Sequence, residues 1–456
     1  MTNKSKIKII FIFTILIFFF FISYNKVFID KYKKFQNRQE LLKNKDLISI
    51  KKKEIQENKF LNLKFTKKED HFIINEKNIE ISKFSNEIFN FSGRRASLEY
   101  YENKIFLITG TGEIYFINEE DLNEKSQLVF SKINTNLNDF IDKDYLDKYE
   151  EIFKDIIIKN SDIYVSLVNW KSANQRENFN PAADNCYYTE ILHAKFNKNF
   201  LYFNSFFKMN ECMPIYSNSS GGIMDKYKNN EILISIGDFQ ACEKLAKNFA
   251  QDNNHLAGKI IKVNENTKKF TILSKGHRNP QGLFYDKSEN IIYSTEHGPQ
   301  GGDEIIINNL NEEFTIKNYG WGTASYGDHY PTDEVYKKKI YDACPLKKSH
   351  ERYGYIEPLK NFTPSIGITQ IIKEDKFILS KNNNHVLYFV SLGYTEGEGR
   401  QSFHRIEYSE NKVKMHEHIE LKERVRDMIY IESKRIFLLF LESSGTIAIV
   451  KLSLTE

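Results

Sequence analysis

The sequence lacks an excess of charge of one sign, and several common functional motifs are missing from it. Its 65 Lys and Arg are nearly balanced by 61 Asp and Glu, so the formal net charge is only +4. Nucleic-acid-binding proteins usually carry a strong positive field, so this balance argues against a nucleic-acid partner. The chain also contains no Walker-type loop and no Ser-His-Asp arrangement, so neither of those chemistries is predicted.

The four cysteines include no C-x-x-C pair, which argues against a zinc site. Their even number permits two disulfides in an oxidising compartment, and four reduced, buried thiols in a cytosolic protein are the alternative. The N-terminal segment favours disulfides. We expect Cys186 to pair with Cys212, because both flank one predicted hairpin.

One uncharged apolar run, residues 9–22, follows three lysines near the N-terminus. No small-x-small cleavage pattern comes after it, which favours an uncleaved signal anchor over a cleaved signal peptide. The run is shorter than the roughly 20 residues of a typical membrane span, but Ser23, Tyr24 and snorkelling lysines extend it. We therefore predict a short tail over residues 1–8 and a signal-anchor transmembrane segment over 9–25. The rest of the chain is expected outside the cytoplasm, which in a bacterium is the periplasmic side of the inner membrane.

A charged stretch without Pro or Gly follows the predicted anchor and extends to about Lys68. It carries only a weak helical stripe of apolar residues, and its heptads are poor for a coiled coil. We predict a spacer over residues 26–68 that separates the next domain from the membrane.

Long helical patterns are absent from Leu98 onward, and paired runs of β-forming residues recur instead. The six paired regions are 104–117, 162–169 with 190–196, 231–238 with 258–263, 290–296 with 303–308, 386–392 with 403–408, and 435–441 with 445–452. Six such units predict an all-β fold, a six-bladed β-propeller over residues 69–456 with four strands in each blade. A pair of β-sandwiches is the alternative.

Residues 276–328 concentrate polar side chains at turns between short strands. The residues at these turns are His277, Arg278, Asn279, Gln281, His297, Asp303 and Glu304. Loops held on rigid strands are where binding and catalytic residues usually lie, so this stretch is the candidate site.

The turn at Gly298 and Pro299 can direct backbone carbonyls outward, and such oxygens are ligands for hard cations. Glu304, Tyr319 and Asp328 could supply oxygens to a second, structural ion. The stretch therefore predicts calcium, and the alternative is that its acidic residues only cap a turn.

Arg278, Asn279 and Gln281 share one tight turn before a strand. A guanidinium binds a carboxylate with two hydrogen bonds, and amides read carbonyl and ring-nitrogen groups, so this set suits a planar ligand with several carboxylates. Arg424 and Arg426 lie two residues apart in a predicted strand and therefore point to one face. A solvated face is the alternative for that pair.

The motifs GHRNPQG, TEHGPQGGDEI, NYGWG and RVRD occur in this order, and together they resemble the soluble quinoprotein glucose dehydrogenases and aldose sugar dehydrogenases. The resemblance implies a six-bladed propeller that oxidises sugars with pyrroloquinoline quinone (PQQ) and calcium. It also implies PQQ contacts from Arg278, Asn279, Arg424 and Arg426, a catalytic calcium on the Gly298 and Pro299 carbonyls, and a structural calcium at Glu304, Tyr319 and Asp328.

The sequence departs from this family where a catalytic base is expected. The family pattern is close to H-x-G-G-R, but here Ser219 stands at the His position and Ile223 at the Arg position. Gly393 stands at about the position of the family's active-site Lys. A Ser hydroxyl without assistance cannot act as a general base near neutral pH. Two functions are therefore predicted: a membrane-anchored sugar dehydrogenase with an altered base, or a non-catalytic propeller that keeps its calcium loops and binds a small ligand, glycan or protein.

Overall fold

The computed structural model describes residues 63–67, 72–74, 79–85, 95–122, 127–142, 151–172, 185–197, 199–214, 219–312, 315–373, 384–393 and 398–452. The predicted tail, the anchor and residues 26–62 of the spacer lie outside this part of the chain. Within it, no helix has the length and apolar character needed to cross a membrane.

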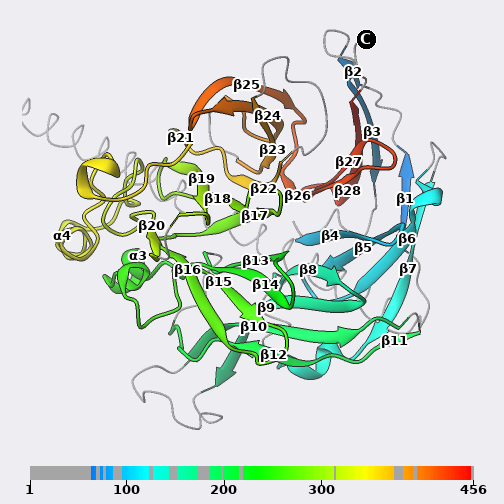
Figure 1. Ribbon diagram of the computed structural model, residues 1–456, viewed down its shortest axis with the longest axis horizontal. Helices are drawn as coiled ribbons and strands as arrows, with labels where there is room; N and C mark the ends of the chain where they lie inside the picture. Colours follow the sequence, from blue (N-terminus) through cyan, green and yellow to red (C-terminus); the bar gives the residue numbers. More distant parts are fainter. Residues whose placement is uncertain are drawn as a thin grey trace, which may run out of the picture. The chain divides into compact units, whose positions relative to one another are not determined.

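The described strands form six four-stranded antiparallel groups, and each begins with an inner strand (Figure 1). We call each group a sheet, although β1 joins the first and the last group into one continuous sheet. In chain order, the first three sheets are β4 (Ala96–Tyr101), β5 (Lys104–Thr109), β6 (Ile114–Asn118) and β7 (Gln127–Thr135); β8 (Phe153–Lys159), β9 (Asp162–Ser172), β10 (Asn185–Lys195) and β12 (Asn204–Lys208); and β13 (Gly221–Lys226), β14 (Glu231–Ile236), β15 (Lys259–Asn264) and β16 (Phe270–Lys275). The next three are β17 (Pro280–Asp286), β18 (Ile291–Glu296), β19 (Asp303–Asn309) and β21 (Lys360–Phe362); β22 (Ile368–Lys373), β23 (His385–Ser391), β24 (Ser402–Ser409) and β25 (Lys412–Glu420); and β26 (Val425–Ile431), β27 (Ile436–Leu441), β28 (Thr446–Leu452) and β3 (Ile79–Ser85).

The inner strands form a closed ring. Each of β4, β8, β13, β17, β22 and β26 contacts the next, and β26 contacts β4 again. A ring of radially arranged sheets is the architecture of a β-propeller, so the all-β, propeller-type prediction is confirmed. The six predicted pairs of runs correspond to the second and third strands of the six sheets, and the sequence pattern missed the inner and outer strands.

Strands from the two ends of the described chain complete the ring of sheets. β3 pairs with β28 from Thr446↔Ser85 to Leu452↔Ile79, and β1 (Leu63–Lys67) pairs with both β3 and β7. β1 lies within residues 26–68, the range predicted as a spacer. Three shorter strands, β2 (Phe72–Ile74), β11 (Phe200–Leu201) and β20 (Lys317–Asn318), add to sheet edges.

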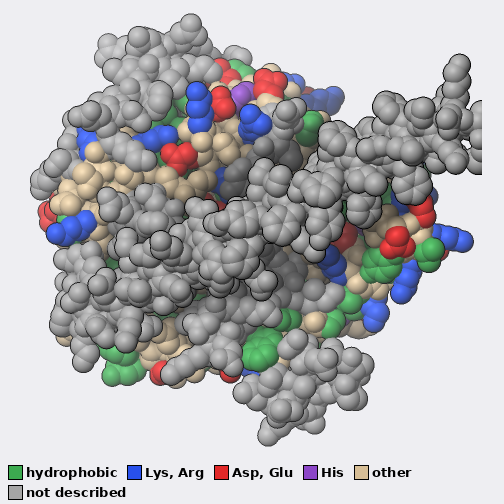
Figure 2. All heavy atoms as spheres, turned by 180° about the vertical axis from the view of Figure 1, so that it is seen from behind, with side chains coloured by type: hydrophobic (Ala, Val, Ile, Leu, Met, Phe, Trp, Pro, Cys, Tyr) green, Lys and Arg blue, Asp and Glu red, His purple; other side chains and the backbone are tan. Residues whose placement is uncertain are grey.

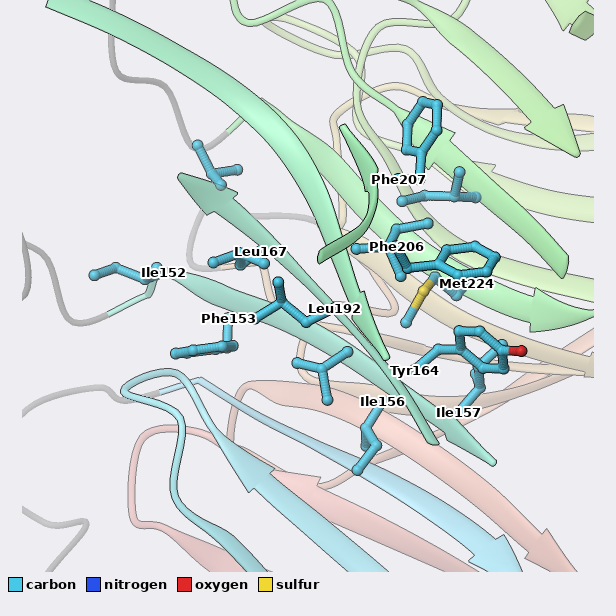
Figure 3. Close-up of a cluster of buried hydrophobic side chains, with 14 of the residues drawn as sticks. Ile152, Phe153, Ile156, Ile157, Tyr164, Leu167, Leu192, Phe206, Phe207 and Met224 are labelled. Atoms are coloured by element: carbon cyan, nitrogen blue, oxygen red, sulfur yellow. The ribbon is translucent and has the colours of Figure 1, made fainter. Parts of the chain in front are cut away.

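Apolar side chains fill the spaces between the sheets. Figure 3 shows one such cluster, in which Ile156, Leu167, Leu192 and Met224 from β8, β9, β10 and β13 are buried together. This packing fixes the inner strands, so residues at equivalent positions along them lie at one level around the axis.

Buried aspartates connect neighbouring inner strands. A backbone N–H at the axial edge of a sheet has no strand to pair with, and burying it unpaired is costly. Asp155 accepts from Met224 N at 2.7 Å, Asp427 accepts from Leu98 N at 2.6 Å, and Asp225 accepts from Tyr285 N at 2.5 Å. The ring is thus held by polar contacts as well as by the apolar layers.

Two disulfides and an unpredicted helix complete the fold. Cys186 is bonded to Cys212, as predicted, and Cys242 of α3 (Ala241–Leu245) is bonded to Cys344 at the end of α4 (Glu334–Ala343). On the face seen in Figure 2, the coloured acidic and basic side chains are interspersed rather than gathered by sign, in keeping with the balanced composition.

Candidate functional site

Basic and amide side chains gather at the start of the inner strands. Lys154, Gln281 and Arg426 are each the second residue of an inner strand, and Arg95 directly precedes β4. All four are buried. Because they occupy equivalent positions in four different sheets, they meet at one end of the central channel. Arg424, which directly precedes β26 and is partly exposed, lies beside Arg426. We call the basic residues Arg95, Lys154, Arg424 and Arg426 the axial cation cluster.

The Gln281 amide ties this cluster together. Its Oε1 accepts from Arg95 at 3.4 Å and from Arg426 at 3.3 Å, and its Nε2 donates to Asn279 Oδ1 at 2.9 Å. Asn279 Oδ1 also accepts from Gly221 N at 3.3 Å, which links the turn before β17 to the start of β13. The amide pair predicted to read a ligand is therefore part of the frame that holds two arginines.

Glu442 is the carboxylate that pairs with the predicted arginine pair. Its Oε1 accepts from Arg424 Nε at 3.1 Å, and its Oε2 accepts from Arg426 Nε. Burial opposes ionisation of Glu442, but the charges of Arg426 and Arg424 outweigh burial and lower its pKa. Arg424 also donates to Leu392 O at 3.0 Å, so the two arginines share one face, as their spacing predicted.

Two members of the axial cation cluster, Arg95 and Lys154, are buried close to other cations. Burial, followed by the neighbouring charge of Arg426, lowers the pKa of Arg95 to about 10. Burial and the charge of Arg95 lower the pKa of Lys154 to about 7. Burial is the largest cause of both shifts, and the pKa of Arg426 is instead raised, because Glu442 and Glu151 outweigh its burial. An anionic ligand near Arg95 and Lys154 would favour their charged forms.

The turn at Gly298 and Pro299 lines a pocket of about 260 Å³ beside the cluster, together with His297, Tyr330 and Arg424. Gly298 O accepts from Arg278 at 2.8 Å, and Pro299 O lies 3.5 Å from Ser365 Oγ. Both carbonyls thus point toward donors. Gly393, at the position of the expected family Lys, lines the same pocket, so no ammonium enters the pocket from that position.

Arg278 is buried and paired, which differs from a guanidinium held free for a ligand. It donates from Nε and Nη2 to Glu243 Oε1 at 3.2 and 3.1 Å, and it lies over the Trp321 ring at 5.2 Å. Its Nη1 donates to the His297 and Gly298 carbonyls. Arg278 therefore positions the turn that carries Gly298.

Asp303 fixes that turn from the other side. Its Oδ1 accepts from Gly298 N at 3.0 Å, and its Oδ2 accepts from Ile366 N at 3.0 Å, Gly367 N at 2.6 Å and Ile368 N at 3.3 Å. Four backbone donors occupy this carboxylate, so Asp303 acts as a clamp between the fourth and fifth sheets.

The donor set fits PQQ better than it fits a calcium ion bound by protein alone. The four cations of the cluster face two carboxylates, Glu442 and Glu151, and this excess of cations suits a ligand with several carboxylates. Gly298 and Pro299 offer two neutral oxygens, whereas calcium takes six to eight. No group of three or more metal-binding side chains occurs among the described residues. A calcium ion at this turn would therefore depend on a bound ligand for its anionic oxygens.

The three residues predicted for a structural ion are not all brought together. Glu304 and Tyr319 line one small buried space, and Glu304 Oε1 lies 3.5 Å from His350 Nε2. Asp328 instead pairs with Lys348 at 2.8 Å, with a side chain that is 63% exposed, and the Tyr319 hydroxyl donates to Ile307 O at 3.0 Å. Burial and neighbouring carboxylates, Glu296 first, raise the pKa of Glu304.

The histidines and Ser219 do not supply an evident base. His277 is fully buried between Ser274 Oγ at 2.8 Å and Glu296 Oε1 at 3.5 Å. His297 lines the pocket, and its buried Nε2 has no hydrogen-bond partner among the described residues. Burial lowers the pKa of His297 to about 4, so its imidazole is neutral but weakly basic. Ser219 is buried in the approach to β13.

Four residues of the site were missed from the sequence: Arg95, Lys154, Glu243 and Glu442. Lys154 interrupts the apolar run IFKDIII, and Glu442 follows the run IFLLFL, so a charge at a predicted buried strand was the available signal. Arg95 and Glu243 lie in connections without a distinctive pattern.

Comparisons with known proteins agree with this geometry. A family model described as Glucose / Sorbosone dehydrogenase matches residues 158–449. The uncharacterized protein slr1608 of Synechocystis sp. is 33% identical over 153 residues, which cover 30% of this chain and 34% of that protein. Aldose sugar dehydrogenase YliI of Escherichia coli is 36% identical over 94 residues, which cover 18% of this chain and 24% of that protein. The chain thus aligns with only about a third and a quarter of these curated relatives.

Solved structures support the fold. A crystal structure described as glucose dehydrogenase has a TM-score of 0.57 at 19% identity, covering 79% of this chain and 96% of that chain. The soluble aldose sugar dehydrogenase of Escherichia coli in its apo-form has a TM-score of 0.56 at 18% identity, covering 78% of this chain and 96% of that chain. The family match spans more than half of the sequence, and it confirms the resemblance noted in the motifs: the chain belongs to the glucose/sorbosone dehydrogenase family.

Proposed function

We propose that this protein is a membrane-anchored, extracytoplasmic sugar (aldose) dehydrogenase that uses PQQ and calcium. The observation that carries the proposal is the axial cation cluster, in which Arg95, Lys154 and Arg426 are buried and Arg424 lines the pocket at the Gly298–Pro299 turn. When bound, PQQ would supply a two-electron acceptor for hydride from the sugar.

The side chains around the channel would divide the work of binding. Arg424 and Arg426 would hold carboxylates of the cofactor, with Arg95 adding charge from the first sheet, because guanidinium groups bind carboxylates in a fixed geometry. Gln281, supported by Asn279, would hold the Arg95 and Arg426 guanidinium groups in position. The Gly298 and Pro299 carbonyls, positioned by Arg278, would contribute to the calcium site.

The proposed location rests on the N-terminal run at residues 9–22 and on the disulfides. Disulfides persist in oxidising compartments and are rare in the cytosol. The Cys186–Cys212 and Cys242–Cys344 bonds therefore support export of the propeller.

Purified full-length protein, loaded with PQQ and calcium, tests the activity through aldose-dependent reduction of a dye. We expect turnover with at least one sugar of a panel and a shift of the quinone absorbance on binding. The variant that tests the role of the cluster is Arg426→Met, which removes one of its cations and is expected to weaken PQQ binding at least tenfold. No absorbance shift and no turnover with any sugar would refute the proposal.

A binding module without turnover is the second candidate, because Ser219 stands where the base is expected. This function predicts that calcium or PQQ raises the unfolding temperature while no sugar is oxidised. Robust turnover would eliminate it.

A further inference from the structure

Glu243 lies on the short helix α3, and its carboxylate is connected to the turn of the site through a single side chain. Its Oε1 accepts from Arg278 Nε at 3.2 Å and from Nη2 at 3.1 Å, and these two nitrogens form one edge of the guanidinium. On the other side of the guanidinium, Nη1 donates to Gly298 O at 2.8 Å and to His297 O at 3.1 Å. The position of the Gly298 carbonyl therefore depends on where Glu243 holds Arg278.

Glu243 is the only side chain that hydrogen-bonds the Arg278 guanidinium in the part of the chain that the structure describes. Asp238 also lies close to Arg278, but its Oδ2 accepts from Trp321 Nε1 at 2.6 Å. The Trp321 ring in turn covers the guanidinium at 5.2 Å. Because Arg278 and Glu243 are both buried, solvent screens this ion pair only weakly, and Glu243 determines how the guanidinium is oriented.

Two contacts from the region of α4 hold Glu243 in turn. The helices α3 and α4 lie beside each other (Figure 1), and Cys242, the residue before Glu243, is bonded to Cys344 directly after α4. The Cys344 carbonyl can only accept, so His329 Nε2 donates to it at 2.8 Å. The other ring nitrogen, His329 Nδ1, lies 4.0 Å from Glu243 Oε1. Cys344 is thus connected to Glu243 through the disulfide and through the His329 ring.

We propose that Glu243 is a positioning residue, which sets the Gly298–Pro299 turn through Arg278 and is itself held in place by the Cys242–Cys344 disulfide. Because this inference rests on the proposed function, the carbonyls of the turn are taken to contribute to the calcium site. A binding site works only when its groups are held close to their productive geometry by supporting contacts. Loss of Glu243 or of the disulfide should therefore weaken calcium-dependent PQQ binding, although neither one touches PQQ.

A first test needs neither ligand nor turnover. Hydrogen–deuterium exchange of full-length wild type and Glu243→Gln is followed by mass spectrometry in peptides that contain the turn, where Gly298 N donates to Asp303 Oδ1 at 3.0 Å. Local opening sets the rate of amide exchange, so the turn should exchange about tenfold faster or more once Arg278 is held less firmly. Equal exchange of the turn in both proteins would overturn the inference.

Asp286→Asn is the matched control for this measurement. It removes the carboxylate of another buried ion pair, with Lys373, in the same sheet as the turn. Any general loss of stability from breaking a buried pair should appear in this variant as well. The turn in Asp286→Asn should exchange within about threefold of the wild-type rate, and equal acceleration in both variants would assign Glu243 a purely structural role.

The second test asks whether Glu243 acts through Arg278. The calcium concentration that gives half-maximal PQQ binding, followed by the quinone absorbance, should rise about tenfold or more in Glu243→Gln and also in Arg278→Lys. In the double variant it should rise no further, whereas two independent losses would multiply. Multiplying losses, or no rise in Glu243→Gln, would overturn the inference while the proposed function stands. A wild type that binds no PQQ would refute the proposed function, and the exchange rates would then decide the role of Glu243 on their own.

The two disulfides allow a matched comparison under conditions in which circular dichroism shows both variants folded. The variant Cys242→Ala/Cys344→Ala should raise the half-maximal calcium concentration about tenfold or more. The variant Cys186→Ala/Cys212→Ala also loses a covalent link, but it should change this concentration less than about threefold. Equal shifts in the two variants, or no shift in the first, would overturn the role assigned to the Cys242–Cys344 bond.

Discussion

Glu442 offers the most informative single perturbation, because one buried carboxylate holds two arginines of the axial cation cluster. Removing one partner of a buried pair costs about 3–5 kcal/mol, since the other charge remains buried and uncompensated. In Glu442→Gln the amide keeps one acceptor oxygen, and Arg424 is partly exposed, so the loss should be near the lower end, about 3 kcal/mol. Saturating PQQ should reduce this loss, because its carboxylates replace the missing charge.

The assay is denaturant unfolding of full-length wild type and Glu442→Gln at several pH values, with and without PQQ. The pKa of Glu442 is lowered by its arginines, so its contribution is present above about pH 4.3, the value of a free Glu, and is lost on further acidification. The two proteins should therefore converge in acid. Glu334→Gln, which loses an exposed contact with Lys337 at 3.4 Å, is the control and should cost less than about 1 kcal/mol. Equal stability of Glu442→Gln and wild type at pH 7 would refute the reasoning.

Three further predictions concern the frame of the site. Burial and the neighbouring Asp427 raise the pKa of Asp155 to about 8, so the free energy of unfolding of the wild type should fall as pH rises from about 4 through 8. Urea titrations should show a weaker dependence on pH for Asp155→Asn. An unchanged dependence would contradict the raised pKa of Asp155. Replacing Cys242 and Cys344 by Ala opens a link that spans 102 residues and should cost about 4–5 kcal/mol; thermal unfolding measures it, and a loss below about 1 kcal/mol would argue against the chain-entropy explanation. Arg278→Lys keeps the positive charge but loses the planar guanidinium that binds Glu243 and the His297 and Gly298 carbonyls at once. The rise in unfolding temperature on adding calcium, measured by differential scanning calorimetry, should therefore be smaller in Arg278→Lys. An equal rise in both proteins would contradict the role of Arg278 in holding the turn.

The fold could be predicted from the sequence because the middle strands of each sheet carry a strong local pattern. Runs such as EILISIGD and GKIIKV are apolar on both faces, since the second and third strands are covered on both sides. The inner strands have shorter runs of apolar residues. They carry polar residues such as Asp155 and Gln281, which lie near the axis rather than in the apolar layers between the sheets. Because these polar residues interrupt the apolar pattern, the sequence did not predict the inner strands.

The site was predicted in part, because local motifs show residue types but not their partners. Arg424 and Arg426 were placed on one face by spacing alone, and both contact Glu442. Arg278 was expected to meet a ligand, but Glu243, 35 residues earlier, takes its guanidinium. Such pairings depend on long-range contacts that no sequence spacing encodes.

The most direct test of the central claim is a single-turnover measurement. Full-length protein loaded with PQQ and calcium is mixed with an aldose, and the quinone absorbance is followed in the absence of any other acceptor. We expect wild type to bind PQQ and to lose the quinone absorbance on mixing, and Arg426→Met to bind PQQ at least tenfold more weakly. Bound PQQ that no sugar reduces, or PQQ that does not bind at all, would contradict the proposed function.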